Sequence, residues 1–123
     1  MTFARINTGK QGEALAVEFL EKNGYRVLEN NFRCRYGELD IVAIDGEIIA
    51  FVEVKTKTNN RFGPPKLAVD LRKQRQLSKT AMMYLTQKRL NDCPARFDVV
   101  GISIMEDKTE VELIRNAFEL CLR

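Results

Sequence analysis

The stretch GELDIVAIDGEIIAFVEVKTK, Gly37–Lys57, constrains the fold more than any other part of the sequence. Two apolar runs rich in β-branched residues flank Asp45-Gly46, a dipeptide typical of two-residue turns in β-hairpins. The pattern predicts two antiparallel strands, over 38–44 and 47–56. If Asp45 and Gly46 are the two central residues of the turn, Asp40 faces Phe51 across the hairpin.

The rest of the chain predicts two helices and three further strands. Thr8 and Gln11 have capping-box spacing and Gly24 suits the end of a helix, so the first helix is expected over 8–24. Strands are expected at 25–34, 95–104 and 110–118, NNRFGPP reads as a loop, and a second helix should run from Lys66, or from Asp70 as N-cap, to Leu90. We therefore predict a single domain over 1–123, an α/β fold that forms a three-layer α/β/α sandwich around a central mixed β-sheet.

Charged residues lie within the otherwise apolar hairpin. Because side chains alternate along a strand, Asp40, Glu53 and Lys55 should share one face, with Asp40 diagonal to Glu53 at about 7 to 8 Å between backbones. Like charges this close need a compensating cation or proton. Mg²⁺ (or Mn²⁺) is suited to this role, because it prefers oxygen ligands and leaves positions for water and phosphate. Lys55 could then stabilise the charge that develops on a phosphate.

Glu13 adds a third acid to this hypothesis. It is in line with Ala16, Val17 and Leu20, the apolar stripe of the first helix, and Gly9 and Gly12 would let that helix approach the sheet closely. Plainer interpretations remain open for all these residues. Glu53 and Lys55 could be solvated on an outer strand face, Asp40 could form a strand-end turn, and Glu13 could be a first-turn acid favoured by the helix dipole.

The composition excludes several classes of protein. The sequence contains no histidine, which removes Ser-His and Cys-His catalysis and most zinc enzymes. Cys34, Cys93 and Cys121 are scattered and lack metal-ligand spacing, which fits a reducing, cytoplasmic setting. We find neither a signal-peptide pattern nor an apolar run long enough to cross a bilayer, so no membrane association is expected.

Positive charge is concentrated between Lys55 and Lys79, although the whole chain carries a net charge of only +3. In the second predicted helix, one polar stripe is formed by the residues at i, i+3, i+4 and i+7, which are Arg72, Arg75, Gln76 and Lys79. The opposite, apolar side is formed by Leu77, Ala81, Tyr84 and Leu85. A basic stripe with few acids favours a nucleic-acid partner, with DNA as the first expectation, held through its phosphates. The candidate contacts are Lys57, Arg61, Lys66, Arg72, Arg75, Gln76 and Lys79. Tyr36, Phe32 and Phe62 could stack on bases, but packing in the core or in loops is the expected role of each. Met82 and Met83 are expected in the core, and Asp98 should pair with Arg96 or another basic side chain.

Four segments in order, GKQGEALAVEFL, NNFRCRYGELD, FVEVKTK and RFDVV, resemble the YraN-like family of small uncharacterised bacterial proteins. That family is similar to archaeal Holliday junction resolvases of the PD-(D/E)XK nuclease superfamily. The resemblance implies a restriction-endonuclease-like fold in which Asp40, Glu53 and the Val54 carbonyl bind the metal, Lys55 is the catalytic lysine and Glu13 is the helical acid. Leu39 stands in place of the motif proline, and the Q-x-x-x-Y element of the exonuclease branch is absent.

Three functions follow as hypotheses. The first is a Mg²⁺-dependent endonuclease acting on branched or structured DNA, for which a homodimer is plausible by resemblance. The second is a nucleic-acid-binding module that keeps the fold with little or no turnover. The third is a structural or protein-interaction domain in which the carboxylates are incidental. The role of Glu38, which by the predicted register shares the face of Glu53, is left open between ligand and loop anchor.

Overall fold

The computed structural model describes residues 2–57, 69–106 and 108–120. In these ranges a five-stranded mixed sheet has the strand order β1-β2-β3-β4-β5, and only β3 and β4 pair in parallel. The elements are α1 (Thr2–Lys22), β1 (Arg26–Cys34), β2 (Gly37–Asp45), β3 (Ile48–Lys57), α2 (Leu71–Gln87), β4 (Ala95–Ile104) and β5 (Thr109–Phe118). The predicted α/β class and the predicted order of elements are confirmed.

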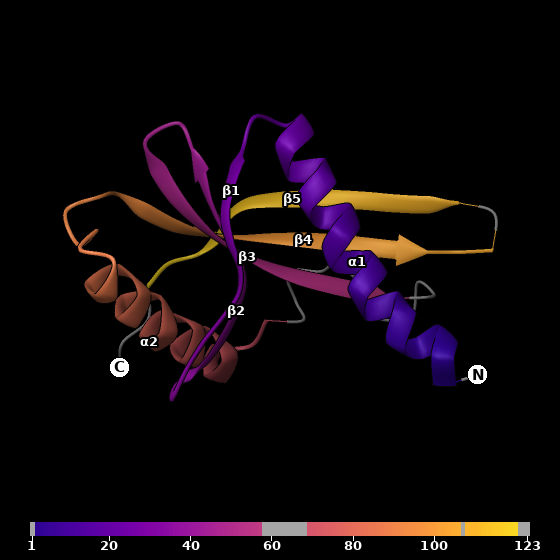
Figure 1. Cartoon of the computed structure of the whole chain (residues 1–123), viewed down its shortest axis with the longest axis horizontal. Coiled ribbons are helices and arrows are strands. Elements are labelled where there is room, and N and C mark those ends of the chain that lie inside the picture. The colour runs from indigo at the N-terminus through magenta and orange to yellow at the C-terminus, as the bar shows by residue number, and fades with distance from the viewer. Residues whose placement is uncertain (1, 58–68, 107, 121–123) are drawn as a thin grey trace.

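The two helices pack on opposite faces of the sheet (Figure 1). On β3, Phe51 joins a cluster with Leu77 and Tyr84 of α2, whereas its neighbour Val52 joins a cluster with Leu20 of α1. Successive strand residues point to opposite faces, so the two clusters are separate cores on the two sides of one sheet. The predicted apolar side of α2 is confirmed, and Met82 and Met83 are partly buried against the same cluster.

The bounds of α1 correct one expectation. The helix begins at Thr2, so the prediction that it begins at Thr8 is wrong. The capping-box spacing at Thr8 permits a helix to start there. The preceding residues Ala4, Arg5 and Ile6 do not break a helix, so α1 extends beyond Thr8 toward the N-terminus. The predicted end is confirmed: Gly24 has φ +90° and the Tyr25 N–H donates to the Leu20 carbonyl, as in a Schellman motif.

The N-terminus of α2 distinguishes between two predicted starts. Asp70 has extended backbone angles and accepts a hydrogen bond from the Lys73 N–H at 2.8 Å, so it is the N-cap. The helix ends at Gln87, three residues before the predicted Leu90. The predicted loop NNRFGPP lies outside the described residues. Within the described residues, neither helix combines the length and apolar character that crossing a bilayer requires.

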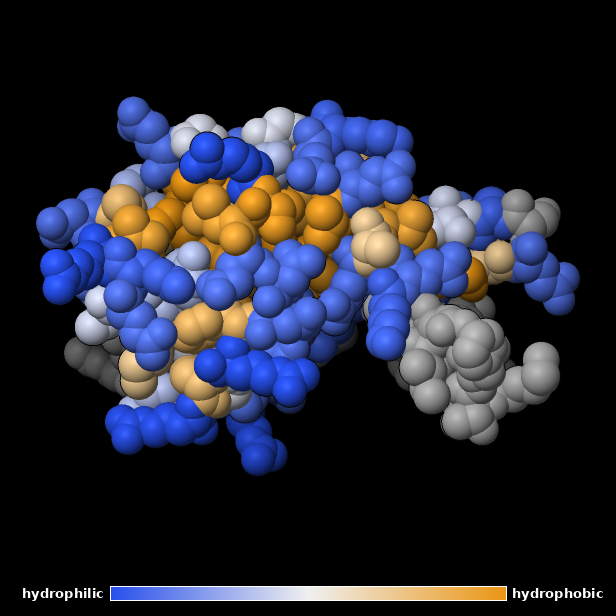
Figure 2. All heavy atoms as spheres, in the orientation of Figure 1, coloured by the Kyte–Doolittle hydropathy of each residue, from blue (hydrophilic) through white to orange (hydrophobic). Residues whose placement is uncertain are grey.

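Helix α1 touches β3 closely through Gly12, as the sequence predicts. A Cβ added at Gly12 would lie 2.2 Å from the Thr56 Oγ1. Figure 2 shows an apolar band on this side of the molecule, which α1 covers only in part. The partly buried residues Val27, Val111 and Leu113 pack against the cluster beneath α1.

Gly12→Ala should therefore destabilise the fold by about 1 kcal/mol. Overpacking costs about 1 to 3 kcal/mol, and the higher helix propensity of alanine offsets about 1 kcal/mol of that cost. In a Thr56→Ala background the clashing hydroxyl is absent, so the same substitution should become neutral or stabilising. Urea denaturation of the four proteins of this double-mutant cycle measures the coupling. A Gly12→Ala protein more stable than the wild type would contradict this contact.

Candidate active site

The hairpin register brings Asp40 closer to Glu53 than predicted. Observed partners include Ile41 with Val52 and Asp45 with Ile48, so the predicted pairing of Asp40 with Phe51 is wrong. The turn is formed by Gly46 and Glu47, and among the described residues of this turn only Gly46 has positive φ, +65°. A glycine first in a two-residue loop suits a type II′ turn, which displaces the pairing by two residues. The pairing of β2 with β3 ends at Ile41 and Val52, so Asp40 and Glu53 are the next residues beyond the last pair.

The two acids are held by β2 and β3 in a sheltered environment. The Asp40 Oδ2 accepts a hydrogen bond from the Val54 N–H at 2.8 Å, which fixes that carboxylate against the neighbouring strand. Glu53 is 7% exposed and lies among the buried residues of the sheet. The Lys55 Nζ is 3.6 Å from the Glu53 Oε1 and is the nearest cation on the same strand. The structure thus brings the side chains of Asp40, Glu53 and Lys55 together.

Burial and mutual repulsion perturb this acid pair. The pKa of Glu53 is raised to about 7, first by burial and then by the neighbouring Asp40 charge and a side-chain hydrogen bond with Asp40, while Lys55 and Lys73 oppose the rise. At neutral pH the pair therefore holds a proton part of the time. Such a pair is a site where a divalent cation could replace the proton as the compensating charge.

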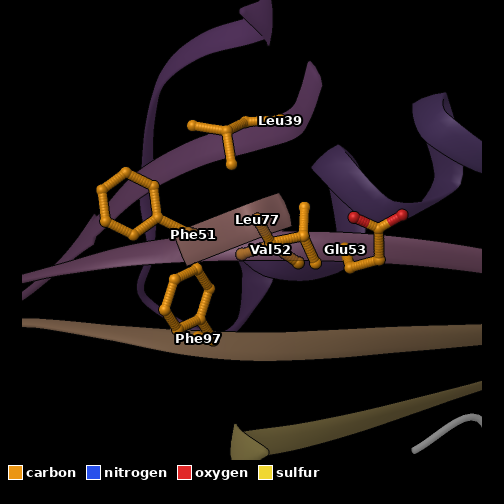
Figure 3. A pocket seen from close by; sticks show the side chains of 6 residues that line it. All are labelled: Leu39, Phe51, Val52, Glu53, Leu77 and Phe97. Carbon is orange, nitrogen blue, oxygen red and sulfur yellow. The ribbon is translucent and has the colours of Figure 1, made fainter. Parts of the chain in front are cut away.

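The burial of Glu53 has an apolar cause. Leu39, Phe51, Val52, Leu77 and Phe97 line a crevice next to it that leaves no room for a water molecule. Figure 3 shows the Glu53 carboxylate turned away from the two phenylalanine rings. The acid is thus dehydrated on one side, which is the ordinary physical cause of a raised carboxyl pKa.

Sequence reasoning did not select Lys73 as a site residue. Lys73 opposes the rise in the pKa of Glu53, and with Lys55, Asp70, Arg72 and Gln76 it lines an open polar pocket of about 330 Å³. The sequence held a signal, because Lys73 is four residues before the buried Leu77 and so lies on the side of α2 that faces the sheet. The first turn of α2 contains Arg72 and Lys73 and no acid, the reverse of what the helix dipole favours.

Two other acids have different partners. The Glu13 Oε2 accepts from Asn31 Nδ2 at 3.4 Å, and α1 packs on the face opposite to Glu53. Among the described residues, no group of three or more His, Cys, Asp or Glu side chains could hold a metal ion, so the structure does not bring Glu13 into the pair. Glu38 lies 3.3 Å from Arg33 Nε, its partner across β1, which suits a strand-anchoring acid.

The predicted basic stripe lies on the solvent side of α2. Arg72, Arg75, Gln76 and Lys79 are exposed, and Lys57 is half-buried at the end of β3. Gln76 also contacts the β1–β2 hairpin, because a Cβ added at Gly37 would lie 2.8 Å from its Nε2. Arg61 and Lys66 lie outside the described residues, as does Phe62. Phe32 is buried in the core as predicted.

The predicted pairing of Asp98 is confirmed. Asp98 is fully buried and lies 3.0 Å from Arg96 Nε. It also accepts from the Tyr25 hydroxyl at 2.7 Å and from the Asn116 N–H at 2.8 Å. Arg96 in turn pairs with Asp45 at the β2–β3 turn. Each strong donor here has an acceptor, so the cluster stabilises this end of the sheet.

In the described residues, the fold and site define an α/β protein with a five-stranded mixed sheet, two helices and a close pair of acids beside a lysine. The chain belongs to the uncharacterised protein family UPF0102, whose model matches residues 12–102. A UPF0102 protein of Geobacter metallireducens is 52% identical over 120 residues, 98% of each chain. One of Syntrophus aciditrophicus is 50% identical over 115 residues, 94% of this chain and 91% of the relative. One of Thermodesulfovibrio yellowstonii is 45% identical over 115 residues, which are 94% of this chain and 98% of the relative. The resemblance to the YraN-like family is thereby confirmed.

Proposed function

We propose that this protein is a Mg²⁺-dependent nuclease that hydrolyses phosphodiester bonds in branched or structured DNA. One observation carries the proposal: the side chains of Asp40 and Glu53 interact between adjacent strands, with Lys55 next to Glu53 and Lys73 of α2 close enough to act on its charge. Two acids and a lysine at the edge of a polar pocket are the groups that metal-assisted phosphate chemistry requires.

The fold supports this assignment. A mixed sheet with α1 on one face and α2 on the other agrees with the restriction-endonuclease-like sandwich that the resemblance implies. In such a fold the acids of interest are carried by neighbouring central strands, as Asp40 and Glu53 are here. The central position of β3 in the sheet makes the Glu53 and Lys55 backbones rigid, which suits groups that must be positioned before a reaction.

The donor set fits a magnesium or manganese ion. Asp40 keeps one carboxylate oxygen free of the Val54 N–H, Glu53 contributes a second carboxylate, and the Val54 carbonyl is the further ligand that the resemblance implies. The excess negative charge of the pair is the property that a divalent cation would neutralise. When bound, such a cation supplies electrostatic stabilisation of the phosphodiester and lowers the pKa of water.

The remaining charged side chains would orient the substrate. Lys55 and Lys73 line the polar pocket from β3 and α2 and would bind phosphate oxygens between them. Arg72, Arg75, Gln76 and Lys79, with Lys57 at the end of β3, would hold neighbouring phosphates along α2. A homodimer would suit a four-way junction, since a junction offers two symmetric strands. The helical acid Glu13 contacts Asn31 in this structure and would assist only after a change in that contact.

The test is cleavage by the wild-type protein. Labelled four-way junction, flap and duplex DNA should be cut in Mg²⁺ or Mn²⁺ and left intact in a chelator, and calorimetry should detect Mn²⁺ binding to the protein alone. A protein that binds no Mn²⁺ and cuts none of the substrates would refute the proposal.

A second candidate is a nucleic-acid-binding module with little or no turnover. It is favoured by the presence of only a pair of acids, without a third, among the described residues of the site. In that case the same substrates would bind in a chelator with strong salt dependence and would stay uncut in metal. Neutralising Arg72, Arg75 and Lys79 together would then lower the salt dependence of binding.

A further inference from the structure

A second pocket lies beside α2 that the proposed metal site does not use. It has a volume of about 500 Å³ and is lined by Tyr36, Lys79, Met82, Met83 and Thr86. Figure 2 shows moderately apolar atoms surrounded by hydrophilic ones over α2. A concave, mainly apolar site with a cation in its lining suits a flat aromatic ligand that carries negative charge nearby.

The ring of Tyr36 is held in place at this pocket. Arg35 and Tyr36 form the two-residue turn between Cys34 and Gly37, which are paired at the ends of β1 and β2. The Arg35 guanidinium carbon lies 4.9 Å from the centre of the Tyr36 ring, and Arg35 Nη2 donates to the Tyr36 hydroxyl at 2.8 Å. A ring fixed before binding loses little entropy when a ligand stacks on it.

The opposite wall consists of two methionines. Met82 and Met83 are partly buried and pack against the core beneath α2, so their side chains provide an apolar surface supported by the fold. Methionine is polarisable and makes favourable contacts with aromatic rings. The described lining contains no acid, and Arg35 and Lys79 place positive charge near it.

The pocket lies at a suitable distance from the polar pocket near Glu53. Lys73 lines the polar pocket and Lys79 lines the apolar one, and six residues of α-helix rise by about 9 Å. A stacked nucleic-acid strand advances about 3.4 Å per nucleotide. The two pockets are thus separated by about two or three nucleotides along one strand.

We propose that the pocket of Tyr36, Met82 and Met83 binds an unpaired nucleobase, which stacks on the Tyr36 ring two or three nucleotides from the phosphate held near Lys73. The inference rests on the proposed function and narrows its substrate to nucleic acid with a single-stranded segment. A base within a duplex is already stacked and paired, and it would have to leave its helix to enter.

The test uses single-stranded DNA containing the fluorescent base 2-aminopurine, with the full-length protein in a chelator so that no cleavage occurs. Binding should quench the fluorescence. Tyr36→Ala should remove the quenching and weaken binding at least about five-fold, because stacking of one base contributes strongly to affinity. Tyr36→Phe loses the same hydrogen bond to Arg35 but keeps a ring, and it should quench as the wild type does. A matched duplex should show little difference among the three proteins.

Several outcomes would overturn the inference. One is a Tyr36→Ala protein that binds and quenches like the wild type. Another is preference of the wild type for duplex over single strand. A third is a change of oligomeric state on Tyr36→Ala, measured by sedimentation, because the pocket would then bind a second copy of the chain. Because this binding assay contains no metal, it is independent of the cleavage assay: quenching here, together with no cleavage in Mg²⁺ or Mn²⁺, would support the base site and refute only the nuclease.

Discussion

Replacing Glu53 with glutamine is expected to abolish metal-dependent cleavage and, in the absence of divalent cations, to make the folded protein more stable at pH 8. Glutamine keeps the shape of the side chain and can donate a hydrogen bond to Asp40, but it removes a buried charge that repels Asp40. Loss of one of the two carboxylate ligands should reduce the cleavage rate at least about 100-fold. A gain in stability with a loss of activity is typical of strained functional sites.

The pH dependence of stability gives the same prediction a second readout. Burial raises the pKa of Glu53 from its ordinary 4.5 to about 7, so the folded state binds this proton more tightly than the unfolded state does. Wild-type stability should fall as the pH rises from about 4.5 to about 7, by up to about 3 kcal/mol, and then level off. Glu53→Gln should lack this decline, so the two proteins should differ most above pH 7.

Urea denaturation in a chelator between pH 4.5 and pH 9 measures these differences. Adding Mg²⁺ should then raise the stability of the wild type, since a ligand that binds only the folded state stabilises it, and should leave Glu53→Gln unchanged. Glu47→Gln is the matched control, because Glu47 is an exposed acid in the turn of the same hairpin. The assignment would be refuted by a Glu53→Gln protein that cuts DNA at the wild-type rate or is less stable than the wild type at pH 8.

The hairpin illustrates how far the sequence determines the site. The strand periodicity and Gly46 predicted the bounds of both strands to within about one residue. The segment IDGE, residues 44–47, can however place Gly46 either first or second in a two-residue turn. The turn type displaces the pairing by two residues. Since a displacement by two preserves the alternation of faces, the proximity of Asp40 and Glu53 was predictable, while the register of the two strands that carry them was not.

Residues on the helices were harder to place, because their positions depend on tertiary packing. The apolar stripes of both helices were predictable from periodicity. Which side chains reach across to β3 depends on how each helix axis crosses the sheet, which periodicity does not specify. Glu13 was therefore expected near Glu53 and contacts Asn31, whereas Lys73 was passed over and lines the pocket with Lys55.

The largest loss of stability is expected from Asp98→Ala. Asp98 is fully buried and accepts hydrogen bonds from Tyr25, Arg96 and the Asn116 N–H. Alanine would leave the buried Tyr25 hydroxyl, the partly buried Arg96 guanidinium and the Asn116 N–H short of an acceptor. Removing one member of a buried ion pair costs about 3 to 5 kcal/mol, against a total stability of about 5 to 15 kcal/mol for a typical domain. The variant should unfold at much lower urea concentration or fail to fold at 37 °C.

Two milder substitutions test whether the loss of stability comes from this network or from a general disruption of core packing. Tyr25→Phe removes one donor and leaves Asp98 with its other partners, so it should cost about 1 kcal/mol. Asp45→Asn acts on the more exposed end of the network and should cost less than Asp98→Ala. Asp98 is paired with Val52 of β3, but its partner Tyr25 packs in the cluster beneath α1, whereas Glu53 lines a crevice with Leu77 of α2, so the network and Glu53 lie on opposite faces of the sheet. Folded Tyr25→Phe protein should therefore bind DNA as the wild type does. An Asp98→Ala protein as stable as Tyr25→Phe would show that the buried carboxylate does not stabilise this end of the sheet.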